Sequence, residues 1–395
     1  MKKRISEYTK KYSFSQAYYW IAFMVIMEFS GMYLNGHGIN NTLIGILLAI
    51  SGAVSAILQP FFGTLADKPS GKSVKTYLLI LICLLLPVSA VLLFHYKQIG
   101  LTLLFYGLTI ILLQIATTFH NALATESINQ GHSLNIGFTR GIASLACGLI
   151  SFVLGASVER FGVTSLAFCV MAMMLCYLFN IKCFPFSKTP SIPKTKDNTD
   201  TAGMLAFFKK YPYFSLSLIG CTCLYFSYIL MMNFSYQIAS SKGANSMQTG
   251  IIVGIAALAE LPVMFGFFKM MKKKPAGFWI MVSGGFFVIK SFASLLVKTA
   301  AGLSLVQLFQ MFSWALLSLA VVYYVNDCMK ETDKIKGQGY MASTYTIAIV
   351  IASLIGGFVI DHFGISCLLM IATVVSGIGT VINIISIRHL QTAFF

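Results

Sequence analysis

Apolar residues run along this chain in twelve long stretches that are separated by short polar segments. Each stretch has the roughly 20 residues or more that an α-helix needs to cross the hydrocarbon core of a bilayer. The even number of spans predicts that both termini lie on the same side of the membrane. The predicted helices cover residues 14–36, 42–66, 74–96, 99–129, 135–158, 163–184, 212–239, 247–271, 276–297, 301–328, 338–360 and 364–387.

Composition places these stretches in lipid rather than in the core of a soluble domain. The chain is 57% hydrophobic and only 10% charged, whereas soluble domains are about half apolar and about one quarter charged. One polar segment, rich in Pro, Thr and Lys, interrupts the pattern at residues 185–211 and reads as a cytoplasmic linker. We therefore expect an all-α membrane protein with twelve transmembrane helices in two pseudo-symmetric six-helix bundles, residues 1–184 and 212–395, around a central cavity.

A short internal repeat relates the two predicted bundles. Residues 155–162 read GASVERFG at the end of span five, and residues 357–364 read GFVIDHFG at the end of span eleven. Parallel repeats of six spans are typical of transporters that rock around a central site. Asp327 and Asp361 lie at span ends, where we expect solvated helix caps.

The charge distribution orients the predicted helices. Lys and Arg number 28 against 12 Asp and Glu, a net charge of +16. Most basic residues fall in the N-terminal segment, the linker and the loops after spans two, eight and ten, all on one side. Cytoplasmic loops of membrane proteins carry such an excess, so we expect both termini in the cytoplasm and the protein in the plasma membrane. The charge then sets topology and contacts anionic lipid headgroups, and no nucleic-acid partner is needed.

The motifs of several other protein classes are missing from the sequence. The nine cysteines are scattered in apolar runs without paired spacing, so they predict neither disulfides nor a metal site. No GxxxxGK[ST] loop for ATP occurs, and neither HSLNIG nor HNALAT completes the HxxxxD pattern of an acyltransferase. We expect no cofactor, no metal and no enzymatic activity. A non-transporting membrane receptor or a membrane-embedded transferase is the alternative of another class.

Five charged residues lie inside the predicted spans, where a charge costs about 2.5–3.5 kcal/mol at the bilayer centre. Such residues persist when they are paired or face a polar cavity. If all five meet, three acids and two bases leave one acid unpaired. We expect this acid, which could carry a proton, to be Glu28 or Glu260. The five residues are Glu28, Glu126, Arg140, Glu260 and Lys290.

Each of these charges also has a structural interpretation. Glu260 and Lys290 could form a stable pair that only positions helices. Glu28 could be hydrated near the outer interface. Glu126 and Arg140 could form a salt bridge at the cytoplasmic helix ends instead of contacting a substrate. Spacing alone does not decide among these interpretations.

Uncharged polar and aromatic residues recur at helical spacing in several spans. Amides interleaved with aromatic rings suit a polyhydroxyl or heterocyclic solute, because amides donate and accept hydrogen bonds and rings stack. Each such residue could equally join two helices by a hydrogen bond. His120 is either a proton relay or a hydrogen-bonded interior histidine. The candidates for substrate contact are Asn121, Tyr236, Gln307, Gln310 and Trp314.

The loop between spans two and three reads QPFFGTLADKPSGKSVK. It resembles the signature loop of the major facilitator superfamily, which consists of a Gly, three residues, an Asp, a basic residue, and then a Gly with further basic residues. The match has one residue inserted around Pro69 and Ser70. The resemblance implies a cytoplasmic latch between the two bundles, formed by Gly63, Asp67, Lys68, Gly71 and Lys72.

Four further segments resemble the lactose permease group of oligosaccharide and proton symporters, which includes phenylpropionate-permease-like proteins. They read AISGAVSAILQPFFGTLADK, TESINQGHSLNIGFTRG, ALAELPVMFGFF and VQLFQMFSW. The resemblance implies that Glu126 and Arg140 bind substrate, and that Glu260 and Lys290 match charged positions of spans eight and nine.

The same resemblance has departures. Gln310 and Ser313 stand where the group carries a histidine and a proton-handling glutamate, and Cys147 stands where it carries a sugar-stacking tryptophan. Any proton coupling must therefore use other acids.

The resemblance and the intramembrane charges together predict a secondary active transporter. We expect alternating access and import of a small polar organic solute, of the sugar, oligosaccharide or nucleoside type, by a monomer together with a proton or another cation. The alternative within transport is movement of aromatic or hydrophobic compounds, suggested by 33 Phe and 19 Met.

Overall fold

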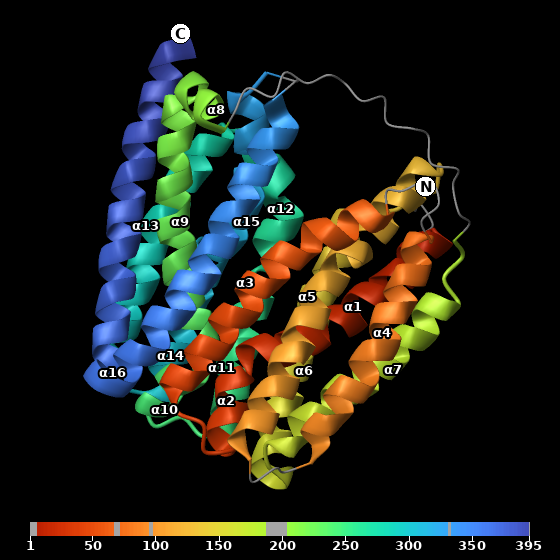
Figure 1. The fold of residues 1–395 in the computed structure, drawn as a ribbon. Helices are drawn as coiled ribbons and strands as arrows, with labels where there is room; N and C mark the ends of the chain where they lie inside the picture. The colour runs from red at the N-terminus through yellow and green to blue at the C-terminus, as the bar shows by residue number, and fades with distance from the viewer. Residues whose placement is uncertain (1–5, 67–71, 95–97, 187–203, 331–332, 395) are drawn as a thin grey trace.

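A computed structural model of the chain describes residues 6–66, 72–94, 98–186, 204–330 and 333–394. Within these ranges the regular structure is helical, and no strand occurs. The helices form two bundles that touch at one end and diverge toward the end that carries both chain termini (Figure 1). The fold is therefore that of an all-α membrane protein.

The first bundle contains the N-terminal helices. Its longest member, α5, has 31 residues and runs nearly the full height of the bundle (Figure 1). The elements are α1 (Glu7–Glu28), α2 (Ser30–Gly36), α3 (Asn41–Ala66), α4 (Val74–Ala90), η1 (Val91–Leu93), α5 (Ile99–Asn129), α6 (Ile136–Phe161) and α7 (Thr164–Lys182).

The second bundle follows the predicted linker. Several of its helices are interrupted within one membrane crossing, which gives it more elements than the first bundle. They are α8 (Met204–Lys210), α9 (Pro212–Asn233), α10 (Ser235–Ser241), α11 (Ser246–Ala259), α12 (Leu261–Met271), α13 (Ala276–Leu296), α14 (Ala300–Val306), η2 (Gln307–Met311), α15 (Trp314–Cys328) and α16 (Lys334–Phe394).

The elements group into the twelve predicted spans. Ten described helices are long and apolar enough to cross a membrane, and α1 with α2, bent by 53°, makes an eleventh span. The twelfth span comes from α16, because Gly364 has a non-helical backbone (φ 80°, ψ 172°) that divides it in two. Gly162, at the matching place of the GASVERFG repeat, has nearly the same backbone (φ 79°, ψ 176°). The repeat thus ends both spans with the same turn.

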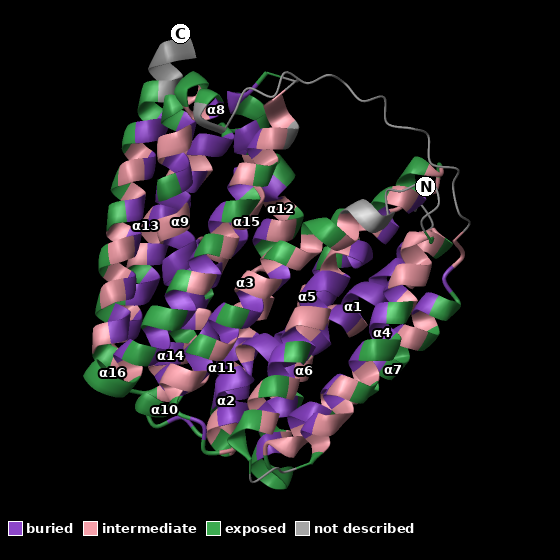
Figure 2. Cartoon of the chain, viewed as in Figure 1, coloured by how far each residue is buried: buried purple, intermediate pink, exposed green. Residues whose placement is uncertain are grey.

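The outer surface of the bundles is apolar. Figure 2 shows exposed residues along the outward sides of the helices, while buried residues fill each bundle. Large apolar side chains such as Ile57, Phe168 and Phe179 are exposed there. Because a soluble protein does not leave so many of these side chains in water, these surfaces face the hydrocarbon of the bilayer.

A second internal repeat lies at interruptions of the first and seventh spans. Residues 27–40 read MEFSGMYLNGHGIN and residues 232–245 read MNFSYQIASSKGAN. The two Phe residues, Phe29 and Phe234, break their helices with similar backbone angles (φ −96°, ψ 8° and φ −111°, ψ 25°). The pattern places Glu28 and Asn233 at equivalent points of the two bundles.

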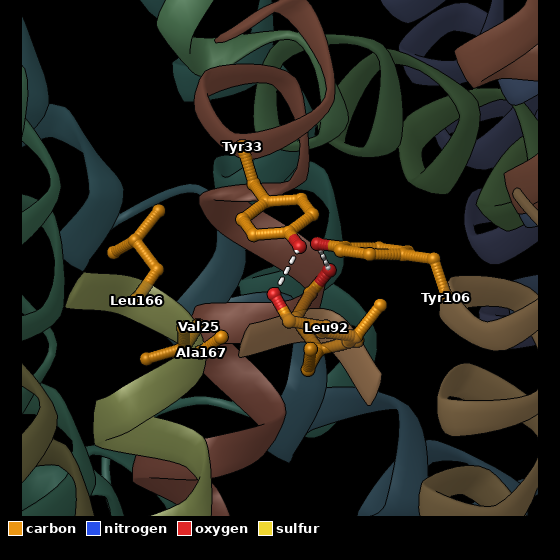
Figure 3. Close-up of a pocket in the computed structure, with 7 residues that line it drawn as sticks. Val25, Tyr33, Leu92, Tyr106, Leu166 and Ala167 are labelled. Atoms are coloured by element: carbon orange, nitrogen blue, oxygen red, sulfur yellow. Dashed lines mark hydrogen bonds between the residues drawn. The ribbon is translucent and has the colours of Figure 1, made fainter. Parts of the chain in front are cut away.

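Side chains satisfy the carbonyl groups at the bend between α1 and α2. Tyr106 donates a hydrogen bond of 2.8 Å to the carbonyl of Ile26, and Ser30 donates one of 2.8 Å to Met27. Tyr33 packs on the Tyr106 ring and donates 2.6 Å to Leu92, beside a void of about 10 Å³ (Figure 3). Buried carbonyl groups need such partners, so these tyrosines hold the bend in place.

Glycines bring the two bundles into backbone contact at the end opposite the chain termini. There α3 packs on α16, and α6 packs on α11. A Cβ on Gly357 would overlap the carbonyl oxygen of Asn41, and one on Gly250 would overlap that of Ser151. Small residues allow this close approach of membrane helices, and they close this end of the space between the bundles.

The predicted linker 185–211 ends in a helix that the pattern did not indicate. Residues 187–203 of the linker lie outside the described residues, but α8 packs on the second bundle. Phe207 and Phe208 contact the ring of Tyr340 at centroid distances of 4.8 and 5.0 Å. The end of the predicted linker is therefore a short helix that contacts the second bundle.

Candidate functional site

A cavity of about 710 Å³ lies between the two bundles. Helices α1, α3, α5 and α6 line one side, and α9, α11, α13, α15 and α16 contribute to the other. The glycine contacts close one end, whereas lining residues such as Arg140, Met264 and Val322 continue toward the end with the termini. A cavity of this size accommodates a small organic molecule.

An amide bridges two of the predicted charges in the second bundle. Gln310 Oε1 accepts a hydrogen bond from Lys290 Nζ, and Gln310 Nε2 donates one of 3.1 Å to Glu260 Oε1. Among the described residues, no ion pair joins Lys290 directly to Glu260 or Glu28. The stable Glu260–Lys290 pair considered from the sequence is thus replaced by a three-residue chain.

Local breaks in the helices place these groups. Glu260 lies at the junction of α11 and α12, two residues before Pro262, which cannot continue the α11 hydrogen-bond ladder. Gln310 lies in the short 3-10 helix η2 between α14 and α15. Broken membrane helices commonly direct polar groups into a central site, and here they direct an acid and an amide toward each other.

Glu28 reaches the same cavity from the first bundle. It is the last residue of α1, directly before the bend at Phe29, and it lines the cavity. Its carbonyl group accepts a hydrogen bond of 3.1 Å from Ser235, which follows the equivalent break in the second bundle. The two repeated breaks therefore meet each other at the closed end of the cavity.

Aromatic rings form a cluster on the wall of the second bundle. Trp314 stacks on Tyr228 with ring centroids 4.0 Å apart and an angle of 4° between the planes. Tyr225 and Tyr345 pack at the edges of this pair, with centroids 6.0 and 5.7 Å from Trp314. All four line the cavity, so the wall offers ring faces and hydroxyl groups to a bound molecule.

Arg140 lies in the first bundle, across the cavity from these groups. It is exposed within the first turns of α6 and lines the cavity together with Asn121. Glu126 is not one of the lining residues. The structure thus brings Arg140 to the cavity and leaves the role of Glu126 as a prediction.

His120 lies inside the first bundle rather than on the cavity. It is fully buried, its Nδ1 is 2.6 Å from the Tyr177 hydroxyl, and Tyr12 and Tyr19 stack on its ring. Tyr19 in turn hydrogen-bonds Thr117, which lines the cavity. This environment is that of a packed interior histidine, and its proton-relay role stays a prediction.

The other predicted site residues divide between the cavity and the rest of the chain. Gln307, like Gln310 and Trp314, lines the cavity, whereas Tyr236 does not. Of the predicted latch, Gly63 and Lys72 are described, and Asp67, Lys68 and Gly71 lie outside the described residues.

The cavity also contains residues that the sequence did not single out. Trp20, Gln59 and Tyr345 all line it. Gln59 donates 2.8 Å to the carbonyl group of Gln114. Gln59 interrupts a very apolar run in its span, and this polar residue among apolar ones could have marked it as a candidate for the cavity. Tyr345 had none, because aromatic residues are frequent along the whole chain.

Two bundles of membrane-spanning helices that share one cavity define a secondary transporter. The chain belongs to the MFS_1 like family, whose model matches residues 12–371, and so to the transporters of the major facilitator superfamily. No protein of curated function matches it in sequence.

Two solved structures share the fold. The crystal structure of nucleoside transporter NupG has a TM-score of 0.77, with 13% identity over 97% of this chain and 99% of that one. The crystal structure of a point mutant of the same transporter has a TM-score of 0.80, with 13% identity over 96% and 98% of the two chains. The family and these neighbours are transporters and not enzymes, which sets aside the transferase alternative.

Proposed function

We propose that this protein carries a small polar organic solute of the sugar or nucleoside type across the plasma membrane together with a proton. The observation that carries the proposal is the composition of the cavity wall. Glu260 and Lys290 lie beside an aromatic cluster on the second bundle, and Glu28 and Arg140 line the cavity from the first bundle.

The aromatic cluster favours a solute with a flat or partly apolar face. Trp314 and Tyr228 present a broad ring surface, and stacking on such a surface adds to the hydrophobic contribution of the contact. Gln307 and Asn121 on opposite walls supply amides that both donate and accept hydrogen bonds. The similarity to a nucleoside transporter and the resemblance to the lactose permease group are consistent with this solute class.

The charges favour proton coupling. Glu28 and Glu260 are two acids that line the same cavity as one base, Lys290, so a proton on one acid neutralises the cluster. Gln310 links Glu260 to Lys290, and a solute hydroxyl that replaced this amide would change the environment of both groups. Binding of solute and proton would then be linked, as reciprocity requires.

The orientation follows from the basic loops. We infer that both termini are cytoplasmic, since the basic loops lie on their side, and that the cavity opens to the cytoplasm in this conformation. The cavity is complete within one chain, so we infer that the monomer is the working unit.

Vesicle transport tests the proposal. A thermal-shift screen of sugars and nucleosides identifies a ligand, because a ligand of the native state raises apparent stability. Uptake of that ligand is then measured with and without a proton gradient. We expect accumulation with the gradient, and loss of accumulation but not of exchange in Glu28→Gln or Glu260→Gln. Uptake that ignores the gradient would leave a uniporter.

Methionines favour a second candidate, transport of aromatic or hydrophobic compounds. Met24, Met27, Met231, Met232 and Met264 all line the cavity, and their flexible side chains adapt to varied apolar ligands. The same screen decides between the two, because stabilisation by aromatic acids and not by sugars or nucleosides would select this candidate.

A further inference from the structure

Asp361 joins the two bundles at the closed end of the cavity. It lies in the last turn of α16 before Gly364, opposite the first residues of α3. Its Oδ2 accepts hydrogen bonds of 2.6 Å from both the backbone nitrogen and the hydroxyl of Thr42, and its Oδ1 accepts one of 2.8 Å from Asn41 Nδ2. We expected a solvated helix cap. The carboxylate is exposed, and the helix that it caps belongs to the other bundle.

These contacts combine charge with direction. The first backbone N–H groups of a helix have no partner within it, and the positive end of the helix dipole favours an anion there. The amide of Asn41 is held in place, because its Oδ1 accepts a hydrogen bond of 2.9 Å from Gln237 of α10. A carboxylate that receives three hydrogen bonds at the start of the 26-residue α3 stabilises this docked arrangement.

The contacts can exist only while the two bundles are closed at this end. Next to them, a Cβ on Gly357 would overlap the carbonyl oxygen of Asn41, and one on Gly45 would overlap that of Ser353. The backbones of α3 and α16 are therefore in direct contact. Any movement that opens this end separates Asp361 from Thr42, since the two residues belong to different bundles.

The second seam between the bundles has no such carboxylate. The repeat places Glu159, at the end of α6, in the position of Asp361, yet Glu159 is exposed and has no hydrogen-bond or ion-pair partner among the residues described. The facing helix α11 is capped within its own bundle, since Asn245 accepts 2.8 Å from the nitrogen of Gln248. Glu159 is thus a matched control for Asp361.

We propose that Asp361 is a positioning residue of the transport cycle, which holds the end opposite the termini closed and must leave the start of α3 before that end opens. Its neutralisation shifts the conformational equilibrium toward opening at that end. The inference uses alternating access, but it depends on neither the solute nor the proton.

A native cysteine reports on this equilibrium. Cys147 lines the cavity, so a membrane-impermeant maleimide added to the face opposite the termini reaches it only when that end opens. The rate is measured in vesicles of defined orientation, and the same chain with Cys147→Ser gives the background from other cysteines. We expect Asp361→Asn to raise the rate from this face by roughly tenfold, the effect of losing charge-assisted hydrogen bonds.

Three controls make the result decisive. Thr42→Val removes the 2.6 Å hydroxyl contact but keeps Asp361, so it should raise the rate in the same direction even if Asp361→Asn fails to fold. Glu159→Gln should leave the rate unchanged, and labelling from the terminus side should not rise in any variant. Equal rates in wild type and both seam variants, an equal rise in Glu159→Gln, or a rise from both faces would each overturn the proposal.

Discussion

Gln310 donates a hydrogen bond of 3.1 Å to Glu260 across the gap between η2 and the end of α11. Because the same amide accepts from Lys290, its two ends are oriented by an acid and a base. An ammonium group only donates and an ionised carboxylate only accepts, whereas an amide does both, so one amide side chain can serve the two charged groups at once. This relationship explains how a lysine with only 6% of its surface exposed is accommodated without a direct ion pair.

Replacing this amide should destabilise the protein. Gln310→Leu leaves Lys290 and Glu260 without their shared partner, and buried polar groups left unsatisfied cost about 1–3 kcal/mol each. We expect a lower apparent melting temperature in detergent. Gln307→Leu is the matched control, because its amide donates only a 3.5 Å bond to Leu303 of its own turn. An equal loss in both variants would contradict a bridging role for Gln310.

Arg140 should matter for ligand binding and little for folding. It is exposed in the cavity and has no ion pair among the residues described, so Arg140→Lys should change stability without ligand by less than about 0.5 kcal/mol. The lysine cannot reproduce the two-pronged hydrogen bonding of the guanidinium, so the thermal shift caused by ligand should fall. Arg160→Lys, at the far end of α6, should keep the full shift. A full shift in Arg140→Lys as well would remove Arg140 from the site.

The glycine contacts predict different effects of the same substitution in the two halves of α16. Gly357→Ala places a Cβ in overlap with the carbonyl oxygen of Asn41 and should force α3 and α16 apart, which lowers the melting temperature. Gly377→Ala meets nothing within 4 Å and should be neutral or stabilising, since Ala favours a helix by up to about 1 kcal/mol over Gly. Thermal unfolding of both variants tests this, and a stable Gly357→Ala would show that the seam has room.

Acid pH should weaken the packing of α8 on the second bundle. Hydrogen bonds from Lys210 and from the Tyr211 hydroxyl, at 2.6 and 2.8 Å, lower the pKa of Asp333 from its ordinary value. An aspartate with a depressed pKa stabilises the folded state above its unfolded pKa, and this contribution is lost as the pH falls through its folded pKa. Hydrogen exchange of residues 204–210 should therefore quicken below about pH 4.

Two lysines of α8 separate this contact from general acid effects. Lys210→Gln removes the ion pair with Asp333 and should quicken exchange at neutral pH. Lys209→Gln is the control, because Lys209 is exposed and forms no ion pair with the described residues. If both variants exchange at the same rate, the Asp333 contact does not hold α8.

The predicted spans agree with the helices because lipid imposes length and apolarity on every crossing. The breaks inside the spans were not predicted, since Phe29 and Phe234 change the backbone angles without changing hydropathy. The MEFS and MNFS repeat marks both breaks in the sequence. It becomes meaningful only when the two segments are seen at equivalent points of the two bundles.

The candidate site was predicted in part for a similar reason. Glu28, Glu260 and Lys290 were identifiable because charge is rare in an apolar chain, and all three line the cavity. Glu126 and His120 carry the same signal, yet neither lines it. Which side of a helix faces the cavity depends on the rotation of each helix against its neighbours, and that rotation results from side-chain packing across many spans.

The sequence by itself therefore determined the class of protein, because the bilayer fixes the length and apolarity of each span and biases the charge of the loops beside it. The tertiary structure decided which polar groups meet. Gln310 lies between Lys290 and Glu260, and Asp361 lies at the start of α3 in the other bundle. These contacts join residues of different helices, and no local pattern encodes them. The first depends on how the helices pack within the second bundle, and the other depends on how the two bundles pack against each other.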